Sequence, residues 1–257
     1  MDRHGIERAA ALLAAAHRSG DRLDALPAGL APADAVEAMA VQDAMVRLIG
    51  EEVAGWKVAH ELDGVVLRGA VLAGRCFAMG AAVPAATMPT LGVEAEIAFR
   101  FDADAPPREA VYSREEVEAI TTPFVAIEIV DSRFTSYDDA DFHCRAADLM
   151  SNGGLVIGPD LPGATPADLA ALEVTLSLDG EVDFRAAASH PRGEPILPAV
   201  DLVNAFRASH GVRKGQVMTT GSFVGLRRAR PGQVVEVAFS GGASGAVSGA
   251  STVSFPA

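Results

Sequence analysis

Three glutamates stand inside two stretches of sequence that are otherwise apolar. Glu94 and Glu96 lie in residues 92–99, GVEAEIAF, and Glu128 lies in residues 126–130, AIEIV. Successive side chains of a strand point to opposite faces, so Glu94 and Glu96 share one face. Carboxylates among apolar groups need compensation, and a hard divalent cation that takes oxygen ligands provides it. The pattern predicts a Mg2+ or Mn2+ site; the alternative is that Glu94 and Glu96 line the wet face of a half-exposed strand.

A lysine occupies another apolar stretch, at residues 55–58, GWKV. A buried ammonium group loses hydration, so its pKa falls unless an acid pairs with it. Either outcome suits proton transfer or carboxylate binding. The alternative is a surface lysine whose stem lies on apolar groups while its ammonium reaches water. We predict that Lys57 orients the substrate carboxylate and moves protons.

Two acids and an arginine surround the end of the strand that carries Glu128, in residues 127–134, IEIVDSRF. Arg133 is predicted to bind substrate, and the alternative is a purely structural ion pair with Asp131.

Two polar loops, DLMSNGG at residues 148–154 and TTGS at residues 219–222, adjoin strand-like runs. Such loops can bring hydroxyl and backbone groups close to a ligand, although each is also typical of an ordinary turn. We predict Asp148 as an acid–base group and Ser151 and Ser222 as substrate-binding hydroxyls.

The composition limits the partners of the chain. Its 257 residues carry a net charge of -13, which argues against a nucleic-acid backbone or an anionic membrane surface as a partner. The two cysteines, Cys76 and Cys144, lack the spacing of a zinc site or a disulfide framework. The N-terminus lacks an apolar signal core, and no apolar run approaches the ~20 residues that span a bilayer. The expectation is a soluble, cytoplasmic protein.

Two regions must position these residues. Residues 1–54 are expected to form an N-terminal helical region, and residues 55–257 a β-rich catalytic domain with the metal site. A capping box at Ser113 and an apolar run at residues 198–209 predict two further helices. The Gly-, Ser- and Ala-rich segment 240–249 is expected to be mobile. Strands are predicted at residues 56–58, 65–72, 93–101, 124–130, 155–157, 173–178, 217–219 and 234–239.

Taken in order, these segments resemble the 2-keto-4-pentenoate hydratase / 2-oxo-3-hexenedioate decarboxylase family of the fumarylacetoacetate hydrolase superfamily. The likeness covers nearly the whole chain. It implies an α+β fold with a mixed β-roll core of the fumarylacetoacetate hydrolase C-terminal-domain type. It also implies a Mg2+ or Mn2+ ion at the positions of Glu94, Glu96 and Glu128, Lys57 acting at the substrate, and an assembly of several identical subunits.

Two positions depart from the pattern of that family. Its hydratases usually carry an acid where this chain has Gly74, and a loop written Ala-Asp-Asn in many relatives has Leu149 in place of the asparagine. These changes affect the acid–base groups rather than the metal ligands. They leave open whether water is added, carbon dioxide is lost or a related substrate is used.

The resemblance predicts a small anionic 2-oxo acid as substrate. Its carboxylate and keto oxygens can chelate one divalent ion, which favours the proton shift that hydration and decarboxylation share. Metal-dependent hydration of a 2-hydroxy-2,4-dienoate is the predicted reaction, with decarboxylation of a 2-oxo-enedioate as the alternative. A non-catalytic member of the fold is a further alternative. C–C bond hydrolysis ranks lower, because no histidine shows an evident acid-paired spacing.

Overall fold

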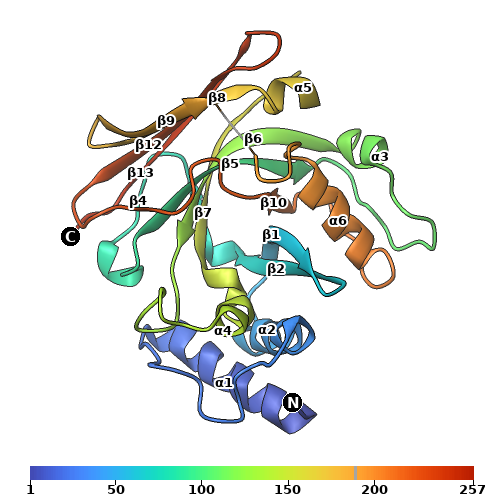
Figure 1. Ribbon diagram of the computed structural model, residues 1–257, viewed down its shortest axis with the longest axis vertical. Coiled ribbons are helices and arrows are strands. Elements are labelled where there is room, and N and C mark those ends of the chain that lie inside the picture. The colour runs from blue at the N-terminus through green and yellow to red at the C-terminus, as the bar shows by residue number, and fades with distance from the viewer. Residues whose placement is uncertain (188–189) are drawn as a thin grey trace.

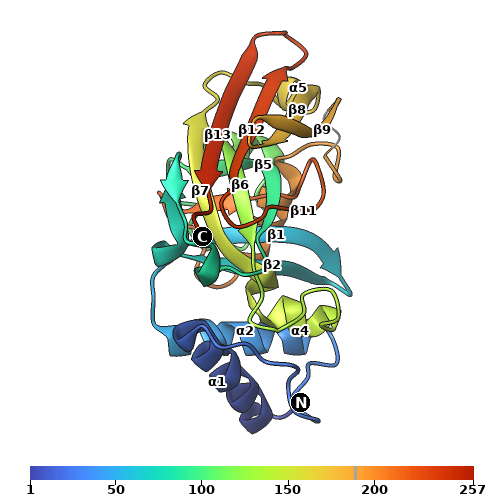
Figure 2. The same cartoon turned by 90° about the vertical axis from the view of Figure 1, so that its left-hand side faces the viewer.

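The computed structural model describes residues 1–187 and 190–257. Figure 1 shows a helical layer at one end of the molecule and two sheets above it. Figure 2, turned by 90°, shows the same separation of helices α1, α2 and α4 from the strands. Within the described part, no helix is both long and apolar enough to cross a membrane.

The N-terminal layer is built from α1 (Arg3–Ser19) and α2 (Ala35–Ile49), which pack on each other. Asp2 and Asp34 cap their first turns, because each side chain accepts a hydrogen bond from a backbone amide of the helix. Each helix ends at a left-handed glycine. Helix α4 (Phe142–Ala147), which the sequence patterns did not predict, packs on α2.

Within the described residues, the larger sheet has eight strands in the order β2-β1-β10-β5-β6-β7-β3, with β11 beside β5. The pairs β1–β10 and β3–β7 are parallel and the other pairs are antiparallel, so the sheet is mixed as predicted. Its strands are β1 (Val53–Leu62), β2 (Val65–Leu72), β3 (Cys76–Ala78), β5 (Gly92–Phe101), β6 (Thr121–Val130), β7 (Asn152–Asp160), β10 (Val217–Thr219) and β11 (Arg227–Arg228).

A five-stranded sheet among the described residues, in the order β4-β13-β12-β8-β9, packs on β6 and β7. Its strands are β4 (Ala81–Ala82), β8 (Leu172–Leu178), β9 (Glu181–Ala187), β12 (Val234–Gly241) and β13 (Val247–Ser254). The expectation of a mobile segment 240–249 is wrong, since it closes the β12–β13 hairpin. A Cβ at Gly249 would lie 2.9 Å from side-chain atoms of Leu161 and Val125. That small residue therefore allows close packing.

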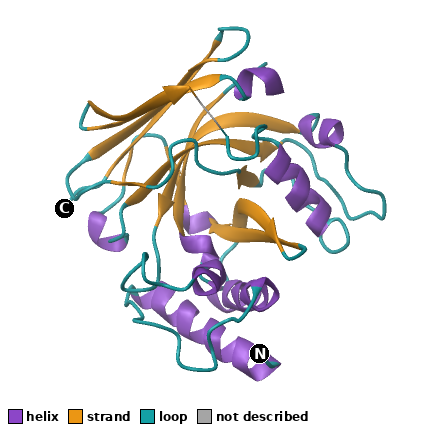
Figure 3. Cartoon of the chain, in the orientation of Figure 1, coloured by secondary structure: helices purple, strands orange, loops and turns teal. Residues whose placement is uncertain are grey.

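Short helices and turns connect the strands, as Figure 3 shows. The predicted capping box starts α3 (Arg114–Glu118), and the predicted second helix is α6 (Leu197–Phe206). Helix α6 packs on β1, where the rings of Trp56 and Phe206 lie 5.0 Å apart. The remaining elements are α5 (Pro166–Leu169), η1 (Ala73–Arg75), η2 (Ala85–Thr87) and η3 (Leu149–Ser151).

Buried apolar side chains form a main core and a smaller second cluster. Strand alternation and register place the second cluster on the face of the larger sheet that carries the three glutamates. We call it the apolar cluster; its buried members are Val71, Ala98, Phe124, Ala126, Leu155 and Val217.

Candidate metal centre

The three glutamates meet on one face of neighbouring strands. In the antiparallel β5–β6 pair, Glu94 lies opposite Glu128, and Glu96 follows on the same face one pleat further along. One carboxylate oxygen of each residue lies within 4.8 Å of the others. Glu96 and Glu128 are fully buried. The expected convergence of the three carboxylates is confirmed, and these side chains do not line a wet face.

Each buried glutamate has one oxygen held by hydrogen bonds. Glu96 Oε2 accepts from the backbone amides of Thr220, at 2.9 Å, and Gly221, at 3.0 Å. Glu128 Oε1 accepts from Asn152 Nδ2 at 2.9 Å. These bonds fix how both carboxylates are oriented.

The second oxygen of each buried glutamate has no such donor. Glu96 Oε1 and Glu128 Oε2 are buried and accept no hydrogen bond from any described residue. An unsatisfied buried acceptor costs about 1–3 kcal/mol, and more when it is charged. A divalent cation would satisfy both oxygens at once, so the donor set fits a hard metal ion.

Lys57 extends from β1 into this acidic group. Its Nζ lies 3.0 Å from Glu128 Oε1 and 3.5 Å from Glu94 Oε2, and its side chain is only 15% exposed. The alternative of a solvent-reaching ammonium is therefore wrong. Burial pulls the pKa of Lys57 down, but the adjacent carboxylates, Glu128 foremost, raise it well above its ordinary value. Lys57 is a cation in this site.

The charges of the site do not balance by themselves. Three carboxylates and one ammonium sum to -2 if all are ionised. Burial raises the pKa of Glu94, with Glu128 adding to the effect and Lys57 opposing it. Burial, then Glu128 and Glu94, raises the pKa of Glu96 well above its usual range. A dication would bring the sum to zero and remove the repulsion.

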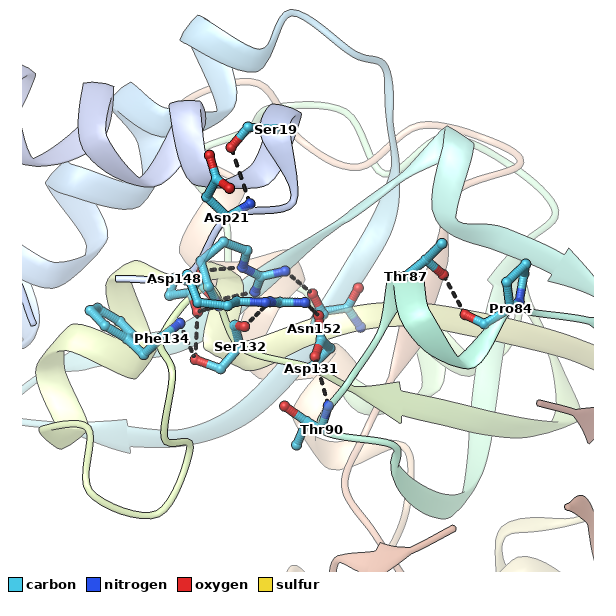
Figure 4. A network of polar contacts seen from close by, with 12 residues as sticks. Ser19, Asp21, Pro84, Thr87, Thr90, Asp131, Ser132, Phe134, Asp148 and Asn152 are labelled. Carbon is cyan, nitrogen blue, oxygen red and sulfur yellow. Dashed lines mark hydrogen bonds and ion pairs between the residues drawn. The ribbon is translucent and has the colours of Figure 1, made fainter. Parts of the chain in front are cut away.

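Asp148 and Arg133 form a buried ion pair. Figure 4 shows Asp148 of this pair in a polar network with Ser132 and Asn152. Asp148 Oδ1 accepts from Arg133 Nε, and Oδ2 accepts from the Arg133 amide at 2.8 Å and from Ser132 Oγ at 3.0 Å. Burial raises the pKa of Asp148, while Arg133 opposes that shift. The substrate contact of Arg133 and the acid–base role of Asp148 stay predictions, but these contacts favour a positioning role.

Asp131 has a different partner from the one considered from the sequence. Arg22 Nη2 lies 2.8 Å from Asp131 Oδ2, and the Thr90 amide donates to Asp131 Oδ1 at 3.2 Å. The alternative of an Arg133–Asp131 pair is therefore wrong. Arg22 follows α1, 109 residues away, so no local pattern pointed to it.

The two predicted substrate-binding serines differ in their surroundings. Ser151 is buried, and its hydroxyl has no hydrogen-bond partner among the described residues. Ser222 Oγ donates to the Gly225 carbonyl at 3.1 Å and accepts from the Val224 amide at 3.3 Å. Ser222 thus closes its own turn, whereas the Ser151 hydroxyl is unpartnered among the described residues; the substrate contacts of both serines stay predictions.

Gly74 lies in the η1 turn, where a Cβ would be 3.0 Å from Glu51 Oε2. The place beside the missing side chain is therefore taken by a carboxylate from the α2–β1 connection.

His190 lies beside the site, although no sequence pattern pointed to it. Its imidazole is buried, Nδ1 accepts from the Arg192 amide at 3.2 Å, and Nε2 lies 2.8 Å from the Thr220 carbonyl oxygen. Since Nδ1 accepts, Nε2 carries the proton and donates it to Thr220. Burial lowers the pKa of His190, which keeps the ring neutral. His190 thereby fixes the loop whose amides hold Glu96.

Replacing His190 by Phe should keep the ring contact with Phe223, now 5.2 Å between centroids, but remove the bond to Thr220. We expect Mn2+ affinity to fall about 10-fold, as for other outer-shell partners of metal ligands. Isothermal titration with Mn2+ measures this. Unchanged affinity in the folded variant would show that the Thr220–Gly221 loop holds Glu96 without help.

No protein-family model matches the sequence. The chain is 29% identical over 233 residues to a 2-keto-4-pentenoate hydratase of Burkholderia vietnamiensis, covering 86% of this chain and 88% of that protein. It is 28% identical over 233 residues to the protein of the same name from Paraburkholderia phymatum, with the same coverage.

Solved structures show the same fold. The chain matches 4-oxalocrotonate decarboxylase from Pseudomonas putida G7, complexed with magnesium and adipate, with a TM-score of 0.79, 18% identity and coverage of 99% and 98% of the two chains. Maleylpyruvate hydrolase from Sphingobium sp. SYK-6, in complex with manganese(II) and pyruvate, matches at a TM-score of 0.51 and 15% identity, covering 79% of this chain and 69% of that one. The resemblance drawn from the motifs and the predicted α+β, β-roll fold are confirmed.

Proposed function

We propose that this protein is a metal-dependent lyase that hydrates a 2-hydroxy-2,4-dienoate, through its 2-oxo-alkenoate form, in the manner of a 2-keto-4-pentenoate hydratase. The observation that carries the proposal is the trio of glutamates with two unsatisfied oxygens, next to a cationic lysine. The names of the similar proteins support the same reaction class.

A Mg2+ or Mn2+ ion held by Glu94, Glu96 and Glu128 would supply Lewis-acid stabilisation of negative charge on the substrate. The remaining chemistry comes from the chain itself. The ammonium of Lys57 is a hydrogen-bond donor suited to a substrate carboxylate. With Glu94 and Glu128 neutralised by a bound dication, the carboxylates would no longer raise the pKa of Lys57, and its proton would then be available to a carbon or oxygen of the conjugated chain. Ser151, in the turn that precedes β7, has a buried hydroxyl without a partner among the described residues, and we assign it to the substrate.

The substrate enters from the side of Lys57 and Glu94. Both side chains are 15% exposed, whereas the Glu128 side chain is fully buried. The 2-oxo acid end therefore reaches Lys57 before it reaches the deeper carboxylates.

The surroundings of the glutamates favour hydration of a monocarboxylate over decarboxylation of an enedioate. Ala126 lies opposite Glu96, and Leu155 lies opposite Glu128, so the apolar cluster borders the site. Among the described residues, Lys57 is the one cation in an ion pair with these glutamates. A second substrate carboxylate would have no cation of its own here, since burying an unpaired charge is costly.

Product analysis distinguishes the two reactions. Incubation of the Mg2+-loaded protein with 2-hydroxypenta-2,4-dienoate should give a 4-hydroxy-2-oxo acid, seen by proton NMR, with one oxygen taken from labelled water. Incubation with 2-oxo-3-hexenedioate should release little carbon dioxide. Release of carbon dioxide without hydration of the dienoate would show that the protein is a decarboxylase and not a hydratase.

The proposal includes a small anionic 2-oxo acid as the partner and an assembly of identical subunits. The second point rests on the family resemblance alone, and sedimentation of the purified protein tests it.

A further inference from the structure

Three consecutive residues before β7 adopt a conformation that side chains other than glycine seldom adopt. Leu149, Met150 and Ser151 have φ of 53°, 52° and 57°. The left-handed conformation costs roughly 1–2 kcal/mol for each residue of this kind. Such strain persists only where the surrounding structure enforces it, and it concentrates at functional sites. We call residues 149–151 the left-handed turn.

Arg133 holds both ends of this turn. Before the turn, Arg133 Nε binds the Asp148 carboxylate, and Nη2 donates to the Asp148 carbonyl oxygen at 2.9 Å. After the turn, Nη1 donates to the Asn152 carbonyl oxygen at 3.0 Å. Arg133 is 4% exposed and Asp148 is fully buried, so water does not compete for these bonds. One planar guanidinium thus clamps the two residues that flank the strained segment.

The turn also rests against the strand pair that carries Lys57. A Cβ on Gly69 would lie 2.1 Å from the Leu149 carbonyl oxygen, so only glycine permits this approach. Gly69 is the register partner of Lys57 in β1–β2. The turn is therefore fixed on one side by Arg133 and on the other by β2.

Asn152, which follows the left-handed turn, contacts a proposed metal ligand. Asn152 Nδ2 donates to Glu128 Oε1 at 2.9 Å, and Glu128 Oε2 is left without a donor. The order of contacts runs from Asp148 to Arg133, to the backbone of Asn152, to the side chain of Asn152, and to Glu128.

We propose that Arg133 and Asp148 are positioning residues that hold the left-handed turn so that Asn152 orients Glu128 for the metal ion. This inference rests on the proposed function, in which Glu128 is a metal ligand. It concerns metal affinity, however, which is measured without turnover.

A double-mutant cycle on Mn2+ binding tests the proposal. Asn152→Ala should weaken Mn2+ binding about 10–100-fold. Arg133→Lys keeps a cation next to Asp148 but cannot reach three acceptors together, so it should weaken binding about 10-fold. Because both changes act on one bond, the double variant should bind Mn2+ within about 3-fold of Asn152→Ala alone.

Arg22→Lys is the matched control. Arg22 pairs with Asp131 and also donates to a backbone carbonyl, that of Ser132, but within the described part of the chain no hydrogen bond or ion pair joins it to residues 149–152. It should lower thermal stability without changing Mn2+ affinity. If Arg133→Lys does not fold, Asp148→Asn replaces it in the same cycle.

Three results would overturn the proposal: wild-type affinity in folded Arg133→Lys, losses that multiply in the double variant, or no Mn2+ binding by the wild type. If the effects of the two substitutions on Mn2+ binding are coupled but the protein does not consume the dienoate, the positioning role of Arg133 and Asp148 is supported and the hydratase function is wrong.

Discussion

Glu128→Gln should abolish measurable binding of Mn2+ at micromolar concentrations. The substitution keeps the shape of the side chain but removes one anionic ligand, and it can place an amide nitrogen against the ion. Loss of an outer-shell partner already costs 10–100-fold in affinity, so loss of a ligand should cost at least about 100-fold. Titration calorimetry or the EPR signal of free Mn2+ measures the change, and hydratase activity should vanish with it.

Glu236→Gln is the control for this experiment. Glu236 is also a strand glutamate, but it is exposed on β12 of the five-stranded sheet, whereas the three converging residues lie in the larger sheet. Its Mn2+ affinity should equal that of the wild type. If Glu128→Gln bound Mn2+ as tightly as Glu236→Gln, the three glutamates would not form the metal site.

Lys57→Met should lower turnover by about 10²–10⁴-fold, which is the usual effect of removing a positioned proton donor. Metal affinity should not fall, because Lys57 now competes with the ion for Glu94 and Glu128. Without the charge of Lys57, the carboxylates of Glu94 and Glu128 are available to the metal ion alone. Steady-state kinetics and Mn2+ titration on the same preparation separate the two effects.

Lys214→Met provides the comparison, since Lys214 is the other lysine of the sequence and is exposed. It should behave as the wild type in both measurements. Turnover by Lys57→Met equal to that of Lys214→Met would remove Lys57 from the mechanism, and a large loss of Mn2+ binding would make its role structural.

The sequence predicted the parts of the site that depend on strand alternation. Glu94 and Glu96 had to share a face, and the apolar neighbours of Glu128 required a buried strand. Pairing of β5 with β6 then brought the three carboxylates together. The resemblance to a known family added the mixed β-roll core and the expectation that Lys57 acts at the substrate.

The partners of those residues could not be predicted, because they come from distant segments. Asn152 lies 24 residues from Glu128, and Thr220 lies 124 residues from Glu96. Local spacing favoured Asp131 as the partner of Arg133, because it lies two residues away. In the fold, Arg133 instead pairs with Asp148, which is 15 residues away. The positive φ of Leu149 is invisible in the sequence, since leucine carries no signal for that conformation.

Small residues misled the reading of segment 240–249 for a related reason. Glycine signals both mobility and close packing, and only the contacts of Gly249 with a neighbouring strand distinguish the two.

The proposed function requires a divalent ion at Glu94, Glu96 and Glu128 for hydration of a dienoate. The most direct measurement follows the ultraviolet absorbance of 2-hydroxypenta-2,4-dienoate with protein that has been stripped by a chelator and then reloaded. We expect no loss of absorbance beyond the uncatalysed rate without metal, and rapid loss after addition of Mg2+ or Mn2+. Consumption that is equally fast in stripped and reloaded protein, or absent from both, would contradict the account.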